Sequence, residues 1–143
     1  MQPAKTVEVQ PPSGIEFRRS EGFRNEYANN TFLESTAWDL KVIFGQADLA
    51  ISPNTVVQHT GITLSWPQVK ILLYFLQIHL TVHEVDYGRL TIPKGVIVDV
   101  PVPDKETLKQ YPNAMQIYKE MCKVHDDFLA ANPEAAPAKR SSQ

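Results

Sequence analysis

Residues 65–88 read SWPQVKILLYFLQIHLTVHEVDYG and predict one long helix. Ser65 is typical of an N-cap, Pro67 is tolerated in a first turn, and Gly88 is typical of a helix stop. On a helical projection the polar residues form one narrow stripe, and nearly every other position is apolar. Such a helix needs cover on more than one side, from the rest of the chain or from a second copy. We expect four of its residues to form an interface: Leu72, Phe75, Leu76 and Ile78.

The clearest β-strand lies ahead of this helix. Residues 38–46 read WDLKVIFGQ, in which apolar and polar residues alternate. This alternation predicts that Trp38, Val42 and Phe44 face the helix. A turn precedes this strand.

Two further strands are predicted on either side of it. Residues 23–33, FRNEYANNTFL, suggest an irregular strand with a bulge near Asn29 and Asn30, because asparagine is depleted from sheets. Residues 55–64, TVVQHTGITL, are rich in β-branched side chains and lead directly into the helix. The expected fold is α+β, an antiparallel meander of three to four strands packed against the long helix.

The C-terminal part of the chain has a different composition. Residues 90–102 contain β-branched residues that suit an edge strand, while their prolines favour an extended arm. Asp104 is a candidate helix cap, Pro112 breaks or starts a helix, and the residues that follow have the spacing of an amphipathic helix. The expected organisation is a disordered lead-in (1–14), an α+β core (15–90), an arm and helix packing on the core or on a partner chain (91–131) and a disordered tail (132–143).

Charge and composition narrow the classes of partner. Fourteen Lys and Arg against sixteen Asp and Glu give a net charge of −2, which gives no strong sign of a nucleic-acid-binding surface. Cys122 is the single cysteine, so no intramolecular disulfide is possible. The start lacks a signal-peptide apolar region, and the longest apolar run, residues 71–76, is far too short to span a bilayer. We expect a cytoplasmic protein with no membrane partner.

Two groups of polar residues are candidate sites. The first is a polar pocket on the sheet, formed by Tyr27, Asn29, Gln46 and His59. Cross-strand pairing of the same groups is the simpler explanation.

The second group lies on the long helix. His79 and His83 are four residues apart and Asp86 follows three later, a spacing that places three possible metal ligands on one side. The glutamate of the His-Glu-x-x-His motif is missing, because position 80 is leucine. We therefore expect packing contacts at these residues, and neither a metal nor another cofactor.

Several short motifs occur in a familiar order: Tyr27-Ala28-Asn29, Phe44-Gly45-Gln46, His59-Thr60 and Ser65-Trp66-Pro67. Together they resemble a family of small bacterial proteins classed as a domain of unknown function. The resemblance covers residues 23–90 and implies a strand-strand-strand-helix unit without an assigned activity. The topology is also similar to that of the export chaperone SecB.

No catalytic motif of high specificity is present, so we expect a non-enzymatic protein. The first hypothesis is a module that associates with itself and binds other proteins. The alternatives are a SecB-like chaperone that holds extended polypeptide, and a small metal protein or enzyme that uses His79 and His83.

Overall fold

The computed structural model describes residues 14–47 and 55–136. The chain divides into two compact units, Met1–Ile71 and Leu72–Gln143. The division falls within the long helix, whereas the predicted end of the core was residue 90. Of the predicted lead-in and tail, residues 1–13 and 137–143 lie outside the described residues.

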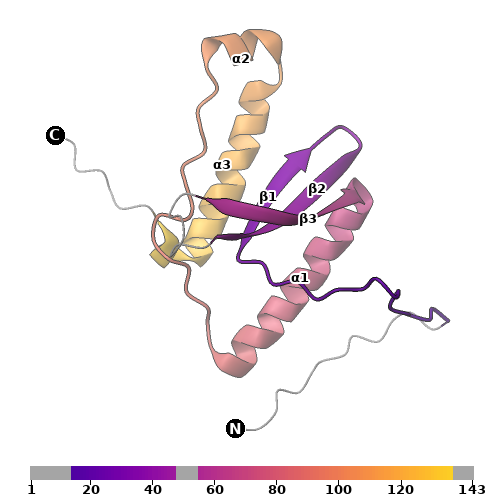
Figure 1. The fold of residues 1–143 in the computed structure, drawn as a ribbon. Helices are drawn as coiled ribbons and strands as arrows, with labels where there is room; N and C mark the ends of the chain where they lie inside the picture. Colours follow the sequence, from indigo (N-terminus) through magenta and orange to yellow (C-terminus); the bar gives the residue numbers. More distant parts are fainter. Residues whose placement is uncertain (1–13, 48–54, 137–143) are drawn as a thin grey trace. The chain divides into compact units, whose positions relative to one another are not determined.

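The first unit is built on an antiparallel sheet of three strands in the order β1-β2-β3. Its strands are β1 (Asn30–Ser35), β2 (Asp39–Ala47) and β3 (Val56–Ser65), drawn in purple to magenta in Figure 1. The predicted α+β class with an antiparallel three-stranded meander is confirmed. In the described part of the chain residues 90–102 form an extended arm and no fourth strand, as their prolines favour.

The turn between β1 and β2 is fixed by one threonine. The hydroxyl of Thr36 donates to Asp39 Oδ1 at 2.7 Å and accepts the backbone N–H groups of Trp38 and Asp39 at 3.0 and 3.1 Å. Hydroxyl-to-backbone bonds of this kind stabilise turns and compete with strand pairing. The strand therefore begins at Asp39, and Trp38 is 84% exposed in the turn. The prediction that Trp38 faces the helix is wrong.

The first strand is shorter than predicted, beginning at Asn30 instead of residue 23. The side chain of Asn29 makes two bonds to the backbone of Ala47: its Nδ2 donates to the carbonyl at 3.1 Å, and its Oδ1 accepts the N–H at 2.7 Å. An amide side chain thereby takes the place of the next strand residue, and the ladder ends here.

The irregularity in the sheet lies on a different strand from the predicted one. Pairing between β1 and β2 is continuous from Asn30 to Ser35, so no bulge interrupts it. In the β2–β3 ladder Phe44 pairs with Thr60 and Gly45 with Gln58. His59 therefore has no partner position on β2 and is the extra residue of a β-bulge.

The helix α1 (Trp66–Tyr87) follows β3 without a loop. Its first residue is tied to the hairpin, because Trp66 Nε1 donates to the Thr36 carbonyl at 3.1 Å. At its other end Gly88 has φ of 91°, and its N–H donates to the Glu84 carbonyl at 2.9 Å. Positive φ is the conformation that glycine adopts without steric cost, which explains the stop at this residue.

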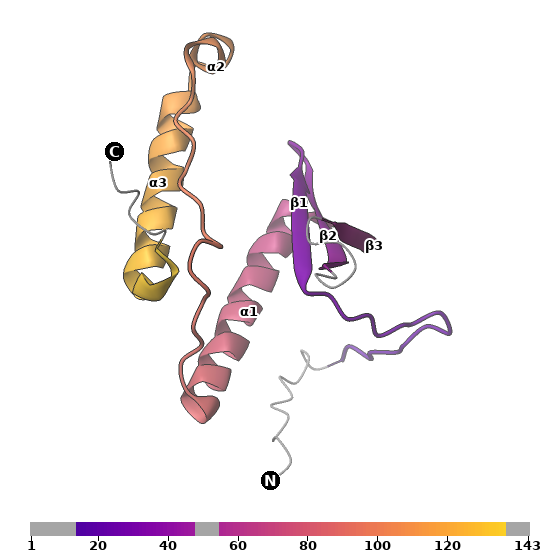
Figure 2. The same ribbon diagram turned by 60° about the vertical axis from the view of Figure 1, so that its left-hand side comes forward.

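The second unit contains the arm and two helices, α2 (Lys105–Gln110) and α3 (Ala114–Ala131). Asp104 caps α2 as predicted, since its carboxylate accepts the Thr107 N–H at 2.7 Å. Both views show the arm running beside α3 and turning back through α2 (Figures 1 and 2). A short 3₁₀ turn, η1 (Pro133–Ala135), follows α3.

One arginine joins the two ends of this arrangement. Arg89, at the start of the arm, donates through Nη2 to the carbonyl of Ala131 at the end of α3. The same nitrogen lies 3.3 Å from Glu134 Oε2 in η1. A cation at a helix C-terminus interacts favourably with the unpaired carbonyls and the helix dipole.

Little of the apolar surface is buried. Among the described residues Ala114 and Ala135 are the buried apolar ones. The central strand β2 is the best covered, with Leu40, Val42 and Phe44 half-buried, and no residue of α1 is buried. The side chains that should build a core are therefore in place but mostly uncovered.

Candidate functional site

The polar cluster on the sheet surrounds the β-bulge. His59 Nε2 lies 3.1 Å from the Tyr27 carbonyl oxygen, and His59 Nδ1 lies 2.9 Å from Thr60 Oγ1. A carbonyl oxygen only accepts, so Nε2 carries a hydrogen and donates to it, while Nδ1 pairs with the hydroxyl of Thr60. Both ring nitrogens are thus engaged in holding the bulge and the segment before β1.

Three of the four residues predicted to form a polar pocket line two hollows on the sheet. A hollow of about 480 Å³ is lined by His59, Phe44 and Ile62 together with residues 22–28 of the segment before β1. A second hollow, of about 580 Å³, includes Tyr27 and Asn29 in its lining. Gln46 lines neither of them.

Two side chains of this cluster make structural contacts. Asn29 is used in pairing with Ala47, and both nitrogens of His59 are used in holding the bulge. The contacts of Asn29 and His59 are of the kind that the simpler sequence interpretation, cross-strand and backbone pairing, describes.

The candidate metal ligands on α1 are not gathered into a site. Within residues 14–47 and 55–136 no three His, Cys, Asp or Glu side chains lie close enough to hold a metal ion. His83 stacks at a tilt against Tyr87, with ring centroids 5.0 Å apart. His79 and Asp86 are exposed.

The predicted interface residues on α1 present a large apolar surface. Leu72, Phe75 and Leu76 are 38%, 39% and 56% exposed, and Ile78 is half-buried. Large apolar residues on the other sides of α1 are exposed as well, among them Ile71, Leu73, Tyr74 and Leu80. A helix that is apolar all round is normally found buried.

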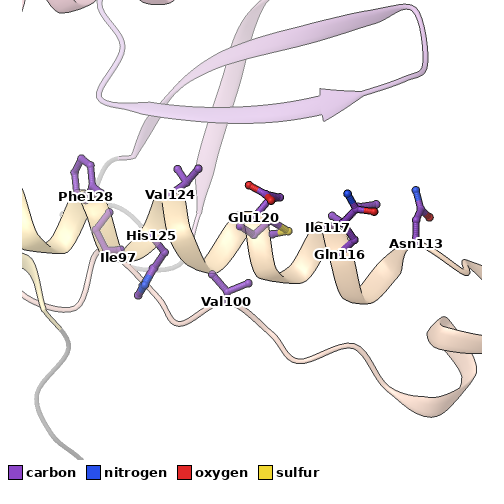
Figure 3. Close-up of a pocket in the computed structure, with 10 residues that line it drawn as sticks. Ile97, Val100, Asn113, Gln116, Ile117, Glu120, Val124, His125 and Phe128 are labelled. Carbon is purple, nitrogen blue, oxygen red and sulfur yellow. The ribbon is translucent and has the colours of Figure 1, made fainter.

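A second apolar surface lies between α3 and the arm (Figure 3). It is an open groove of about 710 Å³, lined from the arm by Ile97 and Val100. From α3 it receives Ile117, Met121, Val124 and Phe128, which recur every three or four residues. The sequence shows the amphipathic spacing of α3. It does not show that the arm lies beside this helix and leaves an open groove between them.

Four of the ten residues that line this groove are polar: Asn113, Gln116, Glu120 and His125. The carboxylate of Glu120 and the amide of Gln116 lie along its side in Figure 3. His125 Nδ1 lies 3.4 Å from Asp126 Oδ1, whereas its buried Nε2 has no hydrogen-bond partner in the described part of the chain. Nearer the N-terminus of α3, the side-chain hydrogen bond with Cys122 raises the pKa of Tyr118 above its usual value. None of these contacts forms a catalytic arrangement such as a nucleophile beside a base.

Comparison of the chain with protein-family models, curated proteins and solved structures gives no match. Among the described helices, none combines the length and the hydropathy that crossing a membrane requires.

Proposed function

We propose that this protein is a non-enzymatic self-association module, whose core is completed by a second copy of the chain. The observation that carries the proposal is that α1 has no buried residue although it is apolar on nearly every side. Obligate dimers often have no stable folded monomer, because the interface supplies the burial that the chain alone lacks.

The free energy gained by burying the exposed apolar side chains of α1 is a substantial part of the stability of a small domain. Full burial of one large aliphatic or aromatic side chain contributes about 1.5–3 kcal/mol. Leu72, Phe75 and Leu76 are 38%, 39% and 56% exposed, so covering what remains would add roughly 2–4 kcal/mol in all, against total stabilities of about 5–15 kcal/mol. If they stayed in water, α1 would lack much of the apolar burial that stabilises a helix in a folded protein.

In the polar cluster on the sheet, the side chains of Asn29 and His59 are engaged with backbone groups, so the proposal rests on the apolar surfaces. The module is expected to bind other proteins through the apolar surface that remains. Its bacterial origin, its cytoplasmic location and its membership of the resembling family remain predictions from the sequence.

Light scattering after size exclusion tests the proposal at micromolar protein concentration. One chain has a mass of 16.1 kDa, and we expect a particle of at least two chains. Leu76→Glu should shift the particle toward the monomer, because it places a charge in the interface. Lys70→Glu on the polar stripe of the same helix is the matched control and should leave the mass unchanged. A wild-type particle of one chain that unfolds cooperatively would contradict the proposal.

A SecB-like holder of extended polypeptide is the second candidate. The observation that favours it is the open apolar groove beside α3, which an extended or helical apolar segment of another chain could fill. A holder should suppress the aggregation of a chemically unfolded test protein at near-equimolar ratio, and Val124→Glu in the groove should abolish that effect. Unchanged aggregation in the presence of the wild-type protein would eliminate this candidate.

A further inference from the structure

The two outer strands of the sheet differ in how well they are protected. β1 has six residues, and its Glu34 pairs with Lys41 Nζ at 3.0 Å. β3 has ten residues, VVQHTGITLS, with no charged residue and no proline. Val57 and Ile62 on β3 are 64% and 47% exposed. Proteins protect free edges with short strands, charges, prolines and β-bulges, and of these features β3 has only the bulge at His59.

We propose that β3 is the joint between two copies of the chain, pairing antiparallel with β3 of the second copy to give a continuous six-stranded sheet. The inference rests on the proposed self-association and names the surface through which it begins. An uncharged edge is compatible with its own copy, because no like charges meet across the two-fold axis.

The register that we propose pairs the whole length of β3 about its middle residue. Directly paired residues of antiparallel strands have their side chains on the same face, so the pairing must join residues of equal face. Placing the two-fold axis at Gly61 satisfies this condition along the whole of β3, provided that His59 is bulged in both ladders as it is against β2. The resulting pairs are Gly61 with Gly61, Thr60 with Ile62, Gln58 with Thr63, Val57 with Leu64 and Val56 with Ser65, the second residue of each pair belonging to the second copy.

The same joint also determines where the two helices begin. A two-fold axis perpendicular to the sheet leaves each face of the sheet on its own side, so the two copies of α1 leave their strands toward the same face. Since α1 follows β3 without a loop, joining the strands places the first turns of both helices at the two central strands of the six-stranded sheet. Pairing at β1 would place the two helix origins on the outer strands, at opposite edges of the sheet.

Cysteine crosslinking of the full chain tests the joint. In a Cys122→Ala background, Gly61→Cys places identical thiols opposite each other on the axis. The structure has room for this side chain, because the nearest atom to a Cβ at position 61 is Lys41 Cδ at 3.8 Å. Thr31→Cys on β1 is the matched control. After mild oxidation or treatment with a short bismaleimide, we expect Gly61→Cys to convert from a 16.1 kDa band to a band of twice that mass, while Thr31→Cys stays single.

The register has its own check, a mixture of Gln58→Cys and Thr63→Cys chains, which should form the mixed dimer. Light scattering of the Cys122→Ala background is run in parallel. If that background is an oligomer but Gly61→Cys stays single, or Thr31→Cys crosslinks in its place, the β3 joint is overturned and self-association stands. A one-chain particle for both the wild type and the background would overturn both proposals.

Discussion

Gly45 is the position at which the sheet is least tolerant of added volume. A Cβ built there would lie 2.8 Å from Val56 Cγ1 and 2.9 Å from the Val57 carbonyl oxygen. Both distances are below those of ordinary van der Waals contacts, and the carbonyl belongs to the backbone of the neighbouring strand. Gly45→Ala therefore requires β2 and β3 to move apart beside the bulge.

The expected magnitude is a balance of two effects. Replacing glycine by alanine inside a regular element gains about 0.5–1 kcal/mol of backbone entropy. Overpacking costs about 1–3 kcal/mol, and a backbone carbonyl has little freedom to relax. We therefore expect Gly45→Ala to lower the free energy of unfolding by about 1–2 kcal/mol.

Gly61→Ala is the matched control on the paired strand. Its Cβ would meet only Lys41 Cδ, at 3.8 Å, which is an ordinary contact with a flexible side chain. We expect it to be neutral or stabilising by up to about 1 kcal/mol. Urea unfolding followed by circular dichroism measures both variants, at one protein concentration because association contributes to stability. Equal stability of the two variants would refute the close approach of β2 and β3 at Gly45.

Three smaller predictions follow from single contacts. Asn29→Ala removes both bonds to the β2 backbone and should cost about 1–2 kcal/mol in urea unfolding. Trp66→Phe should cost about 1 kcal/mol in the same assay, because it removes the indole bond to the Thr36 carbonyl and keeps an aromatic ring. The bond from the Thr107 N–H lowers the pKa of Asp104, so the cap stabilises α2 above the ordinary pKa of aspartate and is lost as pH falls through the lowered value. Asp104→Asn should keep the cap without this acid dependence, as reported by the Thr107 amide shift in an NMR titration, and the same acid dependence in both proteins would contradict this assignment.

Local chemistry predicted the order of elements well. The alternation in residues 38–46 located β2 to within one residue, and Gly88 marked the end of α1. The errors arise where a side chain bonds to backbone in place of a strand neighbour. Thr36 moved the start of β2 to Asp39 and left Trp38 exposed in the turn, and Asn29 shortened β1. Propensity describes what a residue tolerates, whereas such bonds depend on which backbone groups happen to be near.

The sites were predicted less completely, for a related reason. The sequence placed Tyr27, Asn29 and His59 near one another, but it could not show that His59 is the extra residue of a bulge, because that depends on the register between β2 and β3. The groove beside α3 was missed since its other wall is the arm, an irregular segment without periodicity.

The contact of Arg89 with the Ala131 carbonyl affects the order in which the chain folds. Arg89 and Ala131 are 42 residues apart, so bringing them together costs about 3 kcal/mol of chain entropy. This cost precedes the stabilising contacts that offset it. The hairpin of β1 and β2 closes across a turn of only a few residues and faces no comparable barrier. During synthesis the sheet can form as soon as β3 emerges, while the arm must wait for α3 to be complete. A chain that stops before Ala131 would thus keep its hairpin and lose the anchor that holds the arm against α3.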